Sequence, residues 1–355
     1  MTNRTRLLSL VFLASLHSCV LAQLTPDRLY YGIDRPVPMK VTIPEGKAGD
    51  PSIQLFTPAG TEPIATASVL AGPVNLATLF ADLWKPKDGK PAIHYAQLVV
   101  GNERIGAPVV LQPLVDAPMA EMSGGDPKPR FRPGSPMNAG LRAYVDKDVV
   151  LTTSHGDIEF RMRPDQAPNT VWNFRHLVEG GFYTDIIFHR IVNNNPRLGA
   201  PFVIQVGDPT GTGGGGPGYS IDLEDSKLKH DFGVLSMARE PAPNTGGSQV
   251  FVCLSRAGTS FLDGAYTSFA EAVSGADAIR KIAAVPCGPD DRPADPAPKI
   301  ISARLVDAPP FGTGPKPVSA GVTQSGAPSP AAGVNAAPAE ETPVAKPVED
   351  DRKKR

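Results

Sequence analysis

The sequence has few cysteines, few aromatic residues and no surplus of charge of either sign. Only 3 of its 355 residues are cysteine and 6% are aromatic, while 35 Lys and Arg oppose 36 Asp and Glu, for a formal net charge of -1. A chain without a global basic field has no electrostatic reason to bind nucleic acid or an anionic membrane surface. His94 has no second His or Cys at metal-ligand spacing, so we expect no metal site around it.

Long apolar runs are also absent beyond the first two dozen residues. Arg4 and Arg6 precede an apolar run over residues 7–16 that is too short to span a bilayer, which is the pattern of an export signal. Two processing sites stay open: cleavage after Ala22, and a lipid anchor at Cys19 in an imperfect lipobox. Either site predicts an exported chain, periplasmic or secreted, and no later segment is apolar enough to form a membrane span.

Glycine and proline are abundant, with 35 and 39 residues, and their clustering divides the chain. The division predicts a signal peptide at 1–22, a β-rich and sandwich-like domain of unknown role at 23–116, a Pro/Gly-rich linker at 117–142, a second domain at 143–307 and a disordered tail at 308–355.

Alternating apolar residues between turn residues predict the strands of the N-terminal domain. These strands cover residues 38–43, 52–56, 93–100 and 109–111. A short helix is predicted over residues 75–84, because its apolar residues fall on one face.

The second domain is predicted to open with a hairpin over residues 148–162. A helix follows from Pro168 to Gly180, a second helix covers residues 276–284, and a closing strand covers residues 299–306. Their core residues are predicted to be Val171, Phe174, Leu177, Val178, Ile279 and Ile282.

Five short motifs follow one another in the second domain. They are FHR at 188–190, FVIQVGDPTGTG at 202–213, GVLSMA at 233–238, GSQVF at 247–251 and FLDG at 261–264. In this order they resemble the cyclophilins, peptidyl-prolyl cis-trans isomerases built as an eight-stranded antiparallel barrel with two capping helices. The resemblance covers about residues 147–306. It implies an enzyme that acts on proline-containing polypeptides, assists protein folding and needs no metal or cofactor.

The chemistry of such an enzyme needs a hydrogen-bond donor and a pocket. The C–N bond before proline rotates slowly because of its partial double-bond character, with a barrier of ~18–20 kcal/mol. In the twisted state the prolyl nitrogen becomes pyramidal and accepts a hydrogen bond, which a permanently charged, planar guanidinium is suited to donate. An apolar pocket must hold the proline ring while the acyl side rotates.

The resemblance assigns these roles position by position. It implies that Arg190 is the catalytic arginine and that Gln205 orients it and the substrate backbone. His189, next to Arg190, is expected to be structural, because strand alternation turns it to the opposite face. The substrate-binding residues implied are Phe202, Val203, Phe251 and Leu262 in the proline pocket, Gln249 beside it, Ala238 and Arg239 on the segment that pairs with the substrate backbone, and Phe261 and Tyr266 where the family often has Trp and His.

Several positions depart from the family pattern. Fourteen residues separate Arg190 from Gln205, where the family has about seven, and the additional residues at 193–200 would either shield the pocket or widen it. A second function therefore stays open: a proline-peptide binding module with little or no catalysis, and the N-terminal domain as its adaptor. The sequence at 211–216 satisfies the dinucleotide-binding pattern G-x-G-x-x-G, but Pro217 follows where a helix would have to begin, so we expect a loop.

Overall fold

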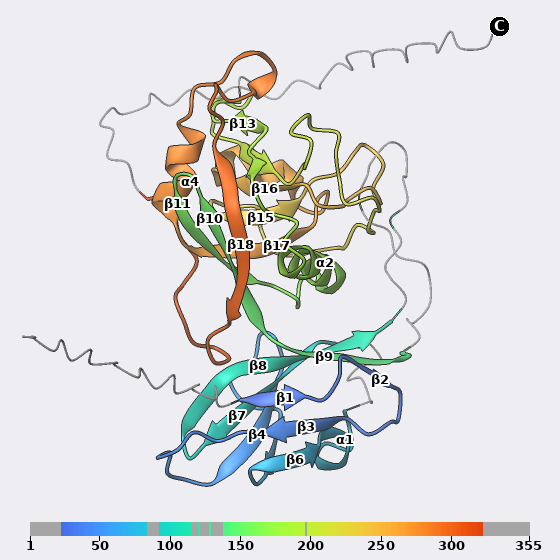
Figure 1. Ribbon diagram of the computed structural model, residues 1–355. Coiled ribbons are helices and arrows are strands. Elements are labelled where there is room, and N and C mark those ends of the chain that lie inside the picture. Colours follow the sequence, from blue (N-terminus) through green and yellow to red (C-terminus); the bar gives the residue numbers. More distant parts are fainter. Residues whose placement is uncertain are drawn as a thin grey trace, which may run out of the picture. The chain divides into compact units, whose positions relative to one another are not determined.

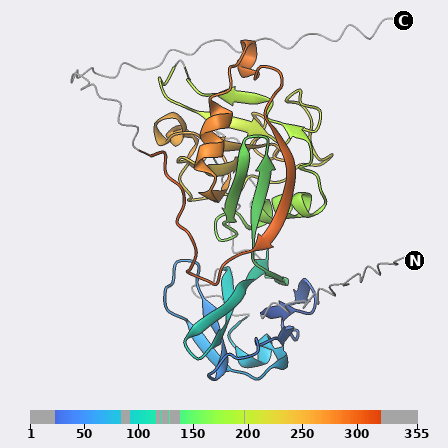
Figure 2. The ribbon, with the colours of Figure 1, turned by 60° about the vertical axis from the view of Figure 1, so that its left-hand side comes forward.

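The computed structural model describes residues 23–83, 92–115, 120, 128, 138–195 and 197–321 (Figures 1 and 2). The predicted export signal at 1–22, most of the predicted linker at 117–142 and the predicted tail from residue 322 lie outside the described residues.

The second domain is built on one antiparallel sheet whose strand order is β12-β18-β10-β11-β17-β15-β16-β14-β13. Only Phe188 and His189 separate the two end strands, so β12 and β13 are halves of one bent strand and the sheet closes on itself. Counted in this way, it is the predicted eight-stranded barrel. Its strands are β10 (Lys147–Thr153), β11 (Gly156–Met162), β12 (Ile186–Ile187), β13 (Arg190–Val192), β14 (Val203–Val206), β15 (Val234–Met237), β16 (Val250–Cys253), β17 (Ser268–Ser274) and β18 (Lys299–Asp307).

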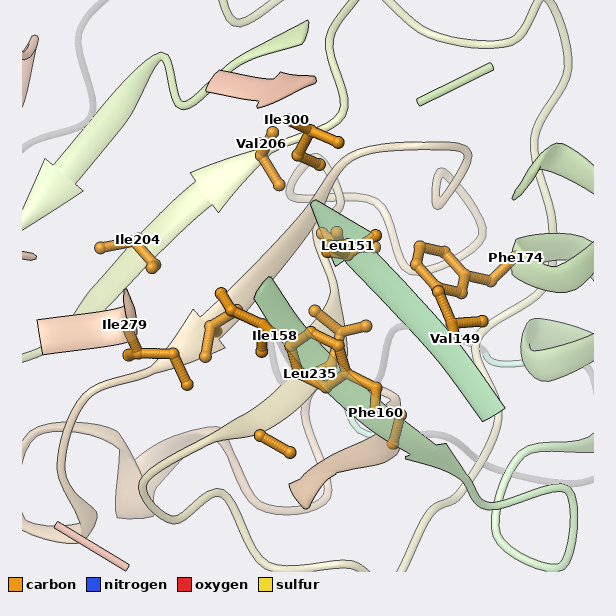
Figure 3. Close-up of a cluster of buried hydrophobic side chains, with 14 of the residues drawn as sticks. Val149, Leu151, Ile158, Phe160, Phe174, Ile204, Val206, Leu235, Ile279 and Ile300 are labelled. Carbon is orange, nitrogen blue, oxygen red and sulfur yellow. The ribbon is translucent and has the colours of Figure 1, made fainter. Parts of the chain in front are cut away.

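Two helices cover the barrel, as predicted: α2 (Pro168–Glu179) and α4 (Ala276–Ala283). Side chains from β10, β11, β14, β15 and β18 converge with Phe174 of α2 and Ile279 of α4 in one apolar core (Figure 3). All six helical residues predicted to face the core are buried. Three short elements were not predicted: α3 (Arg256–Thr259) and the 3-10 turns η2 (Ser260–Leu262) and η3 (Pro289–Asp291).

The N-terminal end of α2 is capped from a distance. The residue before the helix, Ala167, has no side chain that could accept a hydrogen bond. Glu224 supplies the acceptor instead: its carboxylate receives hydrogen bonds from the backbone N–H of Asn169 at 3.0 Å and of Thr170 at 2.7 Å. The buried carboxylate thus satisfies helix donors that would otherwise lack a partner.

The N-terminal domain is a sandwich of two sheets, one of order β2-β9-β8-β7-β4-β5 and one of order β1-β3-β6. Leu24 and Met39 of the smaller sheet share a buried apolar cluster with Ile53, Leu98 and Leu111 of the larger one. The strands are β1 (Leu24–Pro26), β2 (Tyr30–Gly32), β3 (Pro38–Val41), β4 (Pro51–Phe56), β5 (Ala65–Ser68), β6 (Gly72–Asn75), β7 (His94–Val100), β8 (Glu103–Leu114) and β9 (Gly140–Val145).

The four predicted strands of this domain correspond to β3, β4, β7 and β8, while β1, β2, β5, β6 and β9 were missed. The predicted helix over 75–84 is shorter in the structure: α1 covers Leu76–Leu79 and is capped by Asn75, whose side chain accepts a hydrogen bond from the N–H of Ala77. Residue 84 lies outside the described residues. Four of the missed strands, β1, β2, β5 and β6, have only three or four residues and are too short to show alternation, whereas β9 has six.

β9 does not follow the predicted division of the chain. The sequence division assigns residues 140–142 to the linker and 143–145 to the second domain, yet all six pair with β8 in the N-terminal sheet. Asp146 alone separates β9 from β10. Without a turn residue between the two strands, the sequence offers no signal for the change of sheet. The division as a whole stays a prediction.

The predicted disorder does not begin at residue 308. Phe311 stacks on Phe56, with ring centroids 4.7 Å apart, and lies 4.9 Å from the ring of Tyr95. Its backbone N–H donates to Oε1 of Gln97 at 2.8 Å. Further on, the N–H of Val318 donates to a carbonyl of β17. Ring contacts and backbone hydrogen bonds therefore fix this Pro- and Gly-rich stretch to the N-terminal sheet at Phe311 and to the barrel at Val318.

Candidate active site

Strand register brings the two predicted catalytic residues together. β13 pairs with β14 so that Arg190 lies opposite Gln205, and β14 pairs with β16 so that Gln205 lies opposite Phe251. The side chain of Arg190 is 40% exposed, and its Nη2 lies 3.3 Å from Oδ2 of Asp291. A half-exposed guanidinium in this position can reach a bound peptide without prior unfolding of the barrel.

The predicted pocket residues share one apolar cluster beside Arg190. Val203, Phe251 and Leu262 are buried in it, and Phe202 and Tyr266 pack against it. The rings of Phe202 and Phe261 stack at 5.7 Å, and the rings of Phe251 and Tyr266 meet edge to face at 5.7 Å. Phe261 remains 58% exposed, so an aromatic face is presented at the rim of the cluster.

The two predicted glutamines contact each other. Nε2 of Gln205 donates to Oε1 of Gln249 at 2.9 Å, and Nε2 of Gln249 donates to the carbonyls of Gly213 and Gly215, each at 2.8 Å. Among the described residues, no hydrogen bond joins the side chain of Gln205 to Arg190. In this structure Gln205 is itself oriented by Gln249, which in turn is anchored to the glycine-rich loop.

Ala238 and Arg239 line a cleft together with Gln205 and Gln249. The N–H of Ala238 donates to the carbonyl of Gln249 at 2.9 Å, which continues the pairing of β15 with β16. The guanidinium of Arg239 lies 4.5 Å over the ring of Tyr266, and its Nη2 donates to the carbonyl of Ala265 at 2.9 Å. The contact orders a long side chain at the edge of the pocket.

The glycine-rich segment at 211–216 is a loop, as expected, and the described residues between it and β15 form no helix. The segment folds around the carboxylate of Asp208. Asp208 accepts hydrogen bonds from the N–H of Thr210 at 2.7 Å and from the N–H of Gly213 at 2.5 Å. Burial of Asp208 opposes its ionisation, but the hydrogen bonds from Thr210 and Gly213 outweigh burial and lower the pKa of Asp208 to about 2. The carboxylate that organises the loop therefore stays charged at any physiological pH.

The additional residues between Arg190 and Gln205 lengthen the β13–β14 hairpin. Asn195 and Ala200 form an antiparallel bridge beyond the ends of the two strands, and the N–H of Asn195 donates to the carbonyl of Ala200 at 3.0 Å. The effect of this extension on activity stays a prediction.

Two groups near the site were missed by sequence reasoning. Asp291 and Arg292 reach it from the turn after α4, about a hundred residues away from Arg190 in the chain. Arg292 donates through Nη1 to the carbonyl of Gly211 at 3.2 Å and through Nη2 to the carbonyl of Thr212 at 2.9 Å. No motif marks this turn, so only the fold reveals the contact.

A buried histidine supports the pocket from behind and was also missed. The ring of His230 stacks on the ring of Phe251 at 6.1 Å. Its Nδ1 lies 3.0 Å from Asp263 and its Nε2 lies 2.9 Å from Ser236. Burial lowers the pKa of His230 against the opposing effect of Asp263. His230 and Ser236 are fully buried, so the group of His230, Asp263 and Ser236 cannot reach a substrate. Its role is to hold the ring of Phe251 in place.

Comparisons with known proteins agree with the barrel. The model of the cyclophilin type peptidyl-prolyl cis-trans isomerase family matches residues 148–305. Peptidyl-prolyl cis-trans isomerase-like 1 of Aspergillus fumigatus is 43% identical over 165 residues, which cover 45% of this chain and 96% of that protein. Peptidyl-prolyl cis-trans isomerase ppi1 of Schizosaccharomyces pombe is 40% identical over 161 residues, which cover 44% of this chain and 97% of that protein.

Among solved structures, a cyclophilin type isomerase of Cryptosporidium parvum is 33% identical and covers 45% of this chain and 99% of that chain, with a TM-score of 0.41. The sequence matches and the barrel together define a peptidyl-prolyl cis-trans isomerase. Within that class, the chain belongs to the cyclophilin type, and the resemblance drawn from the five motifs is confirmed.

Proposed function

We propose that this isomerase accelerates rotation about X–Pro bonds in exported polypeptides and thereby assists their folding. One observation carries the proposal: a half-exposed arginine lies opposite a glutamine on paired strands, next to an apolar cluster with the exposed ring of Phe261 at its rim. The substrate of such a cleft is a polypeptide whose proline ring enters the apolar cluster. Its flanking backbone lies along β15 and β16.

Each side chain has a role in this proposal. Phe202, Phe251 and Leu262 hold the proline ring, while Arg190 donates a hydrogen bond to the prolyl nitrogen as it becomes pyramidal. Because this bond forms only in the twisted state, it lowers the barrier without strengthening ground-state binding. Gln205 holds the substrate backbone, so that the acyl side rotates while the proline stays fixed.

A protease-coupled assay on a short Xaa-Pro peptide tests the activity. The full chain is expected to accelerate cis-to-trans conversion well above the uncatalysed reaction, whose time constant is on the order of tens to hundreds of seconds at 25 °C. A chain that binds the peptide, as judged by NMR shift changes, yet leaves the rate unchanged would favour the peptide-binding module instead.

Export is supported by the basic residues and the short apolar run within residues 1–22. Among the residues that the structure describes, none of the helices has the length and apolar character needed to cross a bilayer. Mass spectrometry of the chain from its native host tests the proposal. A mature chain that begins at Gln23 indicates signal-peptidase cleavage, a lipid-modified Cys19 indicates an anchor, and a chain that retains residues 1–22 in the cytoplasm contradicts export.

A further inference from the structure

The turn after α4 touches the candidate active site at two points. Asp291 lies 3.3 Å from Arg190, and the next residue, Arg292, donates to two carbonyls of the glycine-rich loop. The turn covers residues 287–293, and backbone contacts join its two ends. Cys287 and Pro293 form an isolated antiparallel β-bridge, and the N–H of Gly288 donates to the carbonyl of Arg292 at 2.8 Å. The backbone position of Asp291 is thus fixed by a small closed loop.

The backbone of this turn is held in an uncommon conformation. Asp290 and Asp291 both have left-handed backbones, with φ of 62° and 58°. Aspartate tolerates this region better than most residues, but two in succession are unusual and persist only where the surroundings fix them. The contact of Arg292 with Gly211 and Thr212 is one such restraint.

The contacts form a closed circuit around the cleft. From Arg190 the circuit passes to Asp291, through Arg292 to the glycine-rich loop, then to Gln249 and Gln205. Gln205 lies opposite Arg190 in the β13–β14 pair, so the circuit returns to its start. Among the described residues, Asp291 is the one side chain that binds the guanidinium of Arg190. The direction in which this guanidinium points therefore depends on Asp291.

We propose that Asp291 is a positioning residue for the isomerase reaction, which aims the guanidinium of Arg190 at the prolyl nitrogen. This inference rests on the proposed role of Arg190. The carboxylate engages Nη2 and leaves the other N–H donors of the guanidinium for the substrate. The side chains of Arg190 and Asp291 are both nearly half exposed, so the ion pair adds little to folding stability. Its main effect is to orient the guanidinium of Arg190.

Asp291→Asn is the test, because it keeps the shape of the side chain and removes the charge. We expect kcat to fall about three- to tenfold, because a free guanidinium samples unproductive directions, while the affinity for a ground-state proline peptide changes less than about twofold. The matched control is Asp290→Asn, which removes a charge from the same turn without touching Arg190, and it is expected to stay within about twofold of the wild type.

A double-mutant cycle separates positioning from a structural effect. In an Arg190→Ala background, Asp291→Asn should cost less than about twofold, because the group that it aims is gone. Equal losses in both backgrounds, an equal loss in Asp290→Asn, or no loss in Asp291→Asn would overturn the positioning role while the wild-type chain remains an active enzyme. A wild-type chain that does not accelerate isomerisation would instead overturn the proposed function, and the role of Asp291 with it.

Discussion

Arg190→Ala is expected to lower kcat/KM for an Xaa-Pro peptide by about 10²–10³-fold, which is typical of the loss of a donor that acts only in the transition state. The prolyl nitrogen cannot accept a hydrogen bond while it is conjugated with the carbonyl, so Arg190 contributes little to ground-state binding. Peptide affinity should therefore change far less than the rate. The protease-coupled assay gives the rate, and NMR titration gives the affinity.

Two further variants sharpen this result. Arg190→Lys keeps the charge but loses the planar fork, so we expect it to recover only a small part of the lost rate. Arg304→Ala removes an exposed arginine from β18 of the same barrel, outside the cleft, and should leave the rate within about twofold of the wild type. If Arg190→Ala matched the wild type in kcat/KM, Arg190 would not be the catalytic donor.

The parts of the site that lie in the five motifs could be predicted from the sequence, because the motifs match the family pattern position by position. The resemblance brings Arg190 and Gln205 into one site, and the structure pairs them across β13 and β14 even though the hairpin is twice the family length. The family motifs also assign Phe202, Phe251 and Phe261 to the binding site, although the ring contact between Phe202 and Phe261 joins the residue before β14 to the turn η2 and does not follow from strand alternation.

The remaining contacts are tertiary and carry no local signal. Glu224 caps α2 from about fifty residues away, and Asp291 reaches Arg190 from about a hundred. Each is a single polar residue in a loop, where the ordinary expectation is a solvated side chain. Phe311 is a similar case, since its Pro- and Gly-rich surroundings indicate disorder, whereas its contacts with Phe56, Tyr95 and Gln97 order it.

A second carboxylate without a sequence signal gives the largest predicted effect on stability. Asp146 is the one residue between β9 and β10, and the residue is 7% exposed. Burial, with a further contribution from the neighbouring charge of Asp148, raises the pKa of Asp146 to about 7. Arg161 and Arg175 oppose this shift without cancelling it.

The sign of the pH dependence follows from the two states of Asp146. In the unfolded chain it releases its proton near pH 4, whereas in the folded chain it keeps the proton up to pH about 7. The folded state therefore binds more protons in this window, and the free energy of unfolding falls as pH rises from about 4 to about 7. Above pH 7, the wild-type chain carries the full cost of a buried charge.

Asp146→Asn should remove that cost. Asparagine keeps an oxygen that can accept the hydrogen bond from the N–H of Lys147, which is 3.0 Å in the wild type. Asp146 also borders a cavity of about 580 Å³, which leaves room for the added NH₂ group. At pH 8 we expect the variant to be more stable than the wild type by about 2–4 kcal/mol, and at pH 4 by less than about 1 kcal/mol.

Urea unfolding at pH 4, 6 and 8 measures the difference. Asp157→Asn, which removes an exposed carboxylate from β11 of the same domain, is the control and should change stability by less than about 0.5 kcal/mol at each pH. A stabilisation by Asp146→Asn that grows with pH would identify the junction between the two sheets as the site of a buried ionisation. A variant that is less stable than the wild type at pH 8, or a difference that does not vary with pH, would mean that the Asp146 carboxylate is solvated or paired well enough to ionise normally.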